Sequence, residues 1–268
     1  MTAAMDGSQS MNQPQIPPED LSPVWQWVIQ GDYPRAIAEL EQRLEQQPGV
    51  RTHYWWLGVA LLLQGQELEA QATWLAAITD GNPEEIDTGA LELGAVLLSV
   101  AQQQQQSEQW GTATLLYQQL LEFDPSHAAA YHGLGVCQLQ QGEVTAAIAT
   151  LSQALELQPH GAAVRLDLGI ALSTHGDRGA AIQQFQAALE LEPDNVEVLR
   201  HLGMNWEDEG NPEAAIACYQ QALTLQPHFP AAHNNWGNLL LAQGVSGGRR
   251  PPLPPGDRPE SQLLSSSL

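Results

Sequence analysis

Glycine recurs along this chain at a fixed interval, and this interval constrains the fold more than any other feature of the sequence. The spacing is 34 residues, except for one gap of 77 residues that equals two intervals plus nine. The recurring residues are Gly31, Gly65, Gly142, Gly176, Gly210 and Gly244. A constant period of this length indicates a stack of similar supersecondary units in place of a single globular core.

Other positions align when the chain is divided into units of this length. The units begin at residues 17, 51, 94, 128, 162, 196 and 230, and the last one is incomplete. Position 8 is glycine in five units, position 20 is alanine wherever it is present, and position 32 is proline in five units. Position 24 carries a large apolar residue in every complete unit: Leu40, Trp74, Tyr117, Leu151, Phe185 and Tyr219.

These positions predict two helices in each unit. A glycine at position 15 favours the left-handed conformation that ends a first helix. A proline at position 32 ends a second helix, because it has no N–H to donate and disfavours helical geometry in the residue before it. Small residues at positions 8 and 20 allow the two helices to approach closely. The sequence therefore predicts an all-α fold of stacked, antiparallel helix pairs.

One stretch carries a family pattern in full. From Tyr131 to Gln138 the sequence is Y-x2-L-G-x2-Q, and Ala147, Leu151, Ala154 and Pro159 follow it. This order resembles the pattern of tetratricopeptide repeat (TPR) proteins, and the resemblance extends over about residues 17–244. It implies an α-solenoid, a right-handed superhelix whose concave groove is lined by the first helices. In that family the groove usually holds an extended peptide or a helix of a partner.

The repeat pattern stops after Gly244. The last residues, VSGGRRPPLPPGDRPESQLLSSSL, have no helical period and contain a third of the arginines of the chain. We expect residues 1–16 and 245–268 to be disordered and residues 17–244 to form the repeat array. The tail is either genuine or the result of a frameshift or truncation within the last unit. In the second case the first helix of that unit exposes an uncapped apolar edge, which favours self-association.

The long gap between the second and third units contains nine additional residues. We expect Pro83–Gln106 to form one long helix that extends from the array, unless Gly89 or Gly94 interrupts it. The alternative is an ordinary insertion that the array tolerates.

The charge of the chain limits its partners. The net charge is −22, lysine is absent, and residues 1–244 contain six arginines against 29 acidic residues. Such a field repels phosphate groups, so nucleic acids and anionic membranes are poor partners, and a basic or neutral protein or peptide fits better. An acidic surface that only keeps the array soluble explains the same composition.

Nothing in the sequence indicates an enzyme. A chain without lysine has no P-loop lysine, Schiff base or Ser-Lys pair. Gly133-Leu134-Gly135 lies within a predicted helix and lacks the third glycine of a dinucleotide-binding loop. The eight histidines do not form a metal-ligand pattern, so neither a metal nor another cofactor is expected.

The sequence also indicates a compartment. Cys137 and Cys218 fall at different unit positions, so we expect two small buried thiols without a disulfide. A signal peptide and a membrane-spanning segment are not recognisable, and a cytoplasmic location is expected.

The family resemblance implies candidate binding residues, because positions 2, 5, 6, 9, 12 and 13 of each first helix face the groove in that family. In the unit from residue 51 these positions include Trp55, Trp56 and Val59, which could hold an apolar side chain of a partner. The alternative is that both tryptophans pack in the core with Trp25 and Trp27. Polar candidates at these positions are His132, Asp167, Arg200, His201 and Glu207.

The last unit has a more specific resemblance. Its sequence AAHNNWGN, with Asn234, Asn235 and Asn238, is similar to repeats of O-linked N-acetylglucosamine transferases and SPINDLY-type proteins. In those repeats, asparagines at position 6 hold the backbone of substrate proteins, and Asn235 occupies that position here. The resemblance keeps two functions open: a non-catalytic adaptor that binds a protein or peptide, and the substrate-recruiting half of a glycosyltransferase without its catalytic domain. A purely structural assembly protein is a third.

Overall fold

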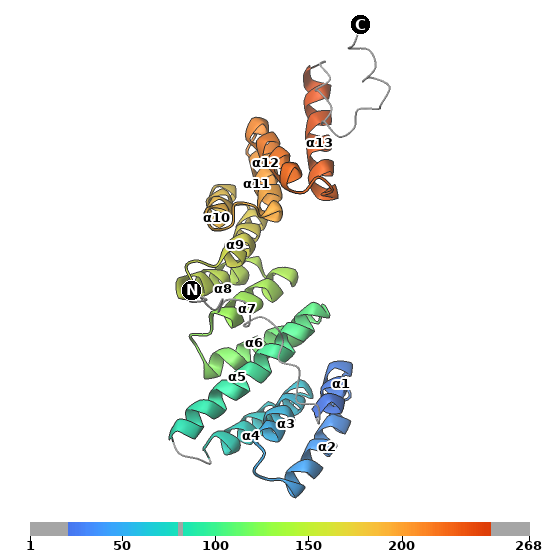
Figure 1. Ribbon diagram of the computed structural model, residues 1–268, viewed down its shortest axis with the longest axis vertical. Helices are drawn as coiled ribbons and strands as arrows, with labels where there is room; N and C mark the ends of the chain where they lie inside the picture. The colour runs from blue at the N-terminus through green and yellow to red at the C-terminus, as the bar shows by residue number, and fades with distance from the viewer. Residues whose placement is uncertain (1–20, 80–82, 248–268) are drawn as a thin grey trace, which may run out of the picture. The chain divides into compact units, whose positions relative to one another are not determined.

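A computed structural model describes residues 21–79 and 83–247, and within these ranges it contains thirteen α-helices and no strand (Figure 1). The first helices along the chain are α1 (Ser22–Gln30), α2 (Tyr33–Gln46), α3 (Arg51–Leu63), α4 (Glu67–Thr79), α5 (Pro83–Gln106), α6 (Trp110–Phe123), α7 (Ala128–Gln140) and α8 (Val144–Leu157). They are followed by α9 (Ala162–His175), α10 (Arg178–Leu191), α11 (Val196–Asp208), α12 (Pro212–Leu225) and α13 (Pro230–Gly247).

The chain divides within α9 into two compact parts, an N-terminal part (residues 1–171) and a C-terminal part (residues 172–268). In the N-terminal part, consecutive helices from α1 to α8 pack on one another. In the C-terminal part, α10 packs on α11, α11 on α12, and α12 on α13. Short connections between packed neighbours produce antiparallel helix pairs. The predicted all-α fold of stacked helix pairs is thus confirmed. Residues 1–16 and most of the expected tail lie outside the described residues, whereas Val245–Gly247 belong to α13.

The helix ends follow the repeat closely. Five of the recurring glycines have positive φ angles, as predicted for the ends of first helices: Gly31, Gly65, Gly142, Gly176 and Gly210, with φ between 75° and 96°. The third unit has no glycine at position 15, and Glu108 takes the left-handed conformation there with φ 58°. Gly244 is an exception to the prediction, because it lies inside α13 and does not end that helix.

The second helices end as the prolines predict. α2, α6, α8, α10 and α12 all stop two residues before the proline at position 32. Several helices begin with a side-chain cap: Asp177, Asn195 and Asn211 each accept a hydrogen bond from the backbone N–H three residues later. Such caps satisfy N–H groups that have no partner within the helix.

Inside three units, the glycine at position 8 lies directly under the large residue at position 24. A Cβ atom on Gly58, Gly135 or Gly203 would come within 2.0, 2.6 or 2.5 Å of the side chains of Trp74, Leu151 and Tyr219, respectively. These contacts explain the joint recurrence of glycine and a large residue. Gly237 of the last unit differs, since no atom of the described residues lies within 4 Å of its Cβ position.

The nine additional residues lengthen α5, which is a single helix of 24 residues that neither Gly89 nor Gly94 interrupts. Its first turns do not extend away from the neighbouring helices. Gly89 is buried, with its Cβ position 3.6 Å from the ring of Trp55, and the indole N–H of Trp55 donates a hydrogen bond of 3.2 Å to Glu92. The insertion therefore packs against α3.

Replacing Glu108 with glycine should stabilise the protein by about 1 kcal/mol, because glycine adopts the left-handed conformation without the steric cost that a Cβ atom brings. Urea denaturation followed by circular dichroism measures the change. Glu209→Gly is the matched control, since Glu209 also follows a first helix but has an ordinary φ of −78°. An equal gain from both substitutions would contradict the explanation.

Gly203→Ala should destabilise the protein by about 1 kcal/mol, although alanine has the higher helix propensity. The added methyl group meets the buried ring of Tyr219, and such overpacking costs more than the helix gains. Gly237→Ala, which meets no atom within 4 Å among the described residues, should be neutral or stabilising. The same urea titration, performed on dilute protein, compares the two variants.

Candidate functional site

The three apolar groove candidates are buried. Trp55 and Val59 are 0% exposed and Trp56 is 2% exposed, so their side chains offer no accessible surface to a partner. The expectation that they line an open groove is corrected by this burial. The alternative, packing in the core, describes them in this structure.

Neighbouring helices cover both tryptophans. The first turns of α5 lie over Trp55. The backbone carbonyl of Trp55 accepts a hydrogen bond of 3.1 Å from the indole N–H of Trp74. Trp25 of α1 packs edge-to-face on Trp56, with ring centroids 5.3 Å apart. Trp27 packs at the margin of the same core and lies under the guanidinium of Arg35, 4.4 Å from the ring centroid.

In the N-terminal part of the chain, the side chains of His132 and Asp167 contact each other. His132 is at position 5 of α7, Asp167 is at position 6 of α9, and 2.6 Å separates His132 Nε2 from an oxygen of Asp167. Both side chains are about a quarter exposed, at 28% and 26%. Side chains at positions 5 and 6 of two consecutive first helices therefore meet, and both are partly accessible.

In the C-terminal part of the chain, Arg200 and His201 belong to a network of side-chain contacts on α11. Arg200 donates hydrogen bonds to Glu197 at 2.8 Å and to the sulfur of Met204 at 3.2 Å, and one of its terminal nitrogens lies 2.6 Å from His201 Nε2. The imidazole of His201 stacks on Phe185 of α10, with centroids 5.8 Å apart. These contacts fix the direction of the guanidinium and of the ring.

Met204 belongs to the same surface, although it was not among the predicted residues. Its side chain is 38% exposed. Its position in the unit is 9, one of the positions that face the groove in the family, and this signal could have identified it. A flexible thioether at an exposed place suits contact with varied apolar groups.

Acidic groups dominate the end of α11. Glu207 accepts a hydrogen bond of 3.4 Å from the hydroxyl of Tyr219, and Asp208 pairs with Arg178 at 3.5 Å. Burial, and then the nearby Glu207 carboxylate, raises the pKa of Tyr219 above its ordinary value. The tyrosine hydroxyl therefore stays protonated and remains a hydrogen-bond donor to Glu207.

The three asparagines of the last unit lie on α13. Asn234 and Asn238 are exposed, and Asn235 is half-buried. Their amide groups can both donate and accept hydrogen bonds, which is what recognition of a peptide backbone needs.

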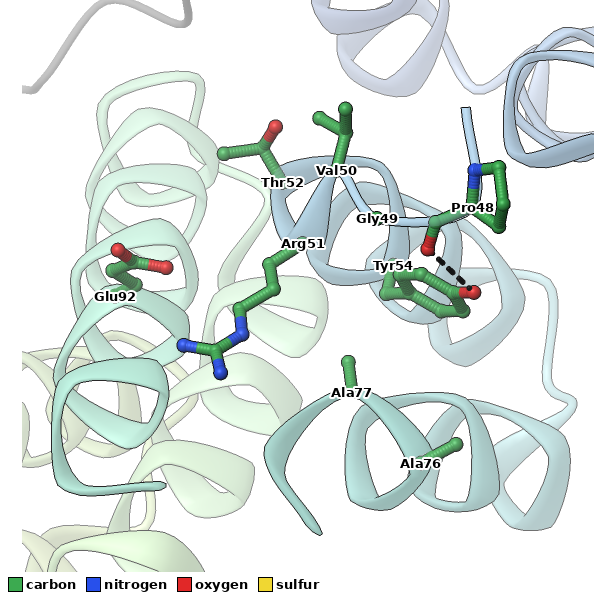
Figure 2. Close-up of a pocket in the computed structure, with 9 residues that line it drawn as sticks. All are labelled: Pro48, Gly49, Val50, Arg51, Thr52, Tyr54, Ala76, Ala77 and Glu92. Carbon is green, nitrogen blue, oxygen red and sulfur yellow. Dashed lines mark hydrogen bonds between the residues drawn. The ribbon is translucent and has the colours of Figure 1, made fainter. Parts of the chain in front are cut away.

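A pocket of about 770 Å³ lies between the turn that joins α2 to α3, the end of α4 and Glu92 of α5 (Figure 2). Its walls consist of Pro48, Gly49, Val50, Arg51, Thr52, Tyr54, Ala76, Ala77 and Glu92. The hydroxyl of Tyr54 donates a hydrogen bond of 3.2 Å to the carbonyl of Pro48, and Glu92 already accepts one from Trp55. The lining includes no histidine, cysteine or lysine.

Burial raises the pKa of the Cys137 and Cys218 thiols to about 11. Both cysteines are free, so their thiols are almost fully protonated at neutral pH.

Across the described ranges, histidine, cysteine and acidic side chains do not gather in groups of three or more that could hold a metal ion. No helix in the described part of the chain is long and apolar enough to cross a membrane.

Four family profiles, all described as TPR or tetratricopeptide repeats, match this sequence. They cover residues 30–86, 104–166, 162–195 and 208–244, and together they include more than half of the chain. No curated protein matches the sequence significantly.

Solved structures with a similar fold have low sequence identity to this chain. The crystal structure of YrrB, a TPR protein with an unusual peptide-binding site, is 18% identical, with a TM-score of 0.53 over 73% of this chain and 96% of YrrB. A MamA structure is 19% identical, with a TM-score of 0.50 over 66% of this chain and 92% of MamA. The Cut9–Hcn1 hetero-tetramer structure is 16% identical, with a TM-score of 0.53 over 81% of this chain and 48% of the matched chain. At these identities the likeness concerns the fold alone.

Proposed function

We propose that this chain, which belongs to the tetratricopeptide repeat family, is a cytoplasmic, non-catalytic module that binds a peptide or partner protein on the face formed by its first helices. Because a repeat scaffold serves many processes, the argument rests on the residues of this face and not on the fold. The face is defined separately for the two compact parts of the chain. It consists of His132 and Asp167 in the N-terminal part, and of Glu197, Arg200, His201, Met204, Glu207 and Asp208 in the C-terminal part.

The contact between His132 and Asp167 carries this proposal. The two residues are 35 positions apart in the sequence, yet their side chains are hydrogen-bonded and partly exposed on adjacent first helices. A polar contact that joins two consecutive first helices suits an extended ligand, which can be bound at successive repeats.

The charges on α11 indicate the character of the ligand. Glu197, Glu207 and Asp208 supply three carboxylates on this helix, and its arginine, Arg200, already binds Glu197 and contacts His201. The exposed thioether of Met204 lies within this acidic surface and contacts Arg200. These features favour a basic or neutral segment that places an apolar side chain on Met204.

Similar structures support a peptide or protein as the ligand. YrrB is described as having a peptide-binding site, and Cut9 was solved in a hetero-tetramer with Hcn1. Both have TM-scores of 0.53 with this chain, so their modes of binding are a reasonable starting point for choosing probes.

Binding can be tested with three short fluorescent peptides that share a Leu-Leu core and differ only in flanking arginines, serines or glutamates. We expect the arginine peptide to bind most tightly and the glutamate peptide least, by fluorescence anisotropy. The double variant Glu197→Lys/Asp208→Lys should weaken binding of the arginine peptide about tenfold, because it reverses two charges of the face.

The control is Glu41→Lys/Glu45→Lys, which makes the same change in net charge at exposed positions of α2. If this control weakens binding as much as the α11 variant, the effect is one of total charge, and the face on α11 is not the site. Absence of binding for all three peptides would also refute the proposal.

A second candidate is the substrate-recruiting half of a SPINDLY-type O-glycosyltransferase, and the asparagines of α13 favour it. Two of them, Asn234 and Asn238, are exposed. Sequencing the gene beyond codon 244 decides the matter. A second helix that resumes in another frame, followed by a nucleotide-sugar-binding domain, would support this candidate, and three frames without either would exclude it.

A further inference from the structure

The last helix has an unfilled notch at Gly237. In α3, α7 and α11 the equivalent glycine is covered by the side chain at position 24 of the following helix, which would lie 2.0–2.6 Å from an added Cβ. In α13, no atom of the described residues comes within 4 Å of that position. Within the described part of the chain, the side of α13 that a second helix covers in these three repeats is therefore uncovered.

A large apolar side chain projects next to this notch. Leu241 is 69% exposed and follows Gly237 by one turn, so the two share a face of α13. Asn234 and Asn238, which are also exposed, border the same face. The opposite side of α13 packs on α12 through Trp236, which is 8% exposed, and Leu239, which is 4% exposed. The open face thus carries a projecting side chain, Leu241, next to the empty space at Gly237.

We propose that this face of α13, defined by Asn234, Gly237, Asn238 and Leu241, binds the same face of a second copy of the chain. The two helices run antiparallel, and the twofold axis passes between the open faces midway along the helix from Gly237 to Leu241. Leu241 of each copy then fills the notch at Gly237 of the other, as Trp74, Leu151 and Tyr219 fill the notches within a chain. Twofold symmetry makes each contact occur twice, and it requires a self-complementary surface such as this one.

The distribution of charge favours this place for a contact between copies. Each chain carries a net charge of −22, so two copies repel each other over most of their surface. Residues 230–247 of α13 contain no arginine, aspartate or glutamate. Repulsion between carboxylates is therefore weakest where the helices α13 meet.

Another exposed apolar stripe provides a comparison. Leu68 and Leu75 of α4 are 80% and 60% exposed, but the acidic side chains of Glu67 and Glu69 lie at the start of the same helix. That stripe has no glycine notch of its own to receive a leucine. Leu68 therefore serves as a control position for substitutions at Leu241.

The oligomeric state of the full chain tests this proposal by sedimentation equilibrium at several protein concentrations. We expect the wild type to exchange between monomer and dimer. Leu241→Arg and Gly237→Glu should each weaken dimerisation about tenfold or more, because they place a charge in an apolar contact. The double variant Gly237→Glu/Leu241→Arg should recover dimerisation, since the introduced carboxylate of one copy faces the introduced guanidinium of the other.

Both positions are open in the protomer, so we expect all variants to keep the helical circular dichroism spectrum. Leu68→Arg, which adds the same charge at another highly exposed leucine, should leave the dimer unchanged. A wild-type chain that stays monomeric at all concentrations would overturn the proposal. Equal weakening by Leu68→Arg, or a double variant no better than the single ones, would also overturn it. The labelled peptides, added to the monomeric Leu241→Arg variant, test the proposed function separately.

Discussion

The structure depends on one contact that is repeated along the chain: a large side chain at position 24 lies on a glycine at position 8. At Gly58 and Gly203 the atoms are so close that a single methyl group has no room. Because the contact joins the two helices of a unit, it fixes their distance and their rotation about their axes. That rotation in turn decides which side chains of each first helix face away from the second helix and remain accessible, among them His132, Asp167 and Met204.

The insertion in α5 modifies this arrangement at one place. In a regular repeat, the accessible face of α3 would include Trp55 at position 5. The additional turns of α5 place Gly89 and Glu92 against this tryptophan. The aromatic residues are therefore part of the core, while the neighbouring turn, the end of α4 and Glu92 of α5 line the pocket shown in Figure 2.

Much of the fold could be predicted from the sequence because glycine and proline act locally. The positive φ angles and the ends of the second helices need only the residues around them. Glu108 shows the limit, since the surrounding repeat imposes the left-handed conformation on a residue that does not favour it. The site was less predictable: the burial of Trp55 depends on an insertion distant in sequence, and the pairing of His132 with Asp167 depends on which rotamers two separate helices allow.

The same repeated contact explains why α13 differs from the other first helices. Each glycine notch is a feature of a first helix, but the side chain that fills it belongs to the second helix of the unit. In the described part of the chain α13 has no such neighbour, so its notch is empty and the leucine one turn later is exposed. Gly237 and Leu241 are one turn apart, so a second copy related by a twofold axis can place its leucine on the glycine of the first copy, and the reverse. The geometry that holds each unit together within the chain is therefore also the geometry that can join two chains at α13.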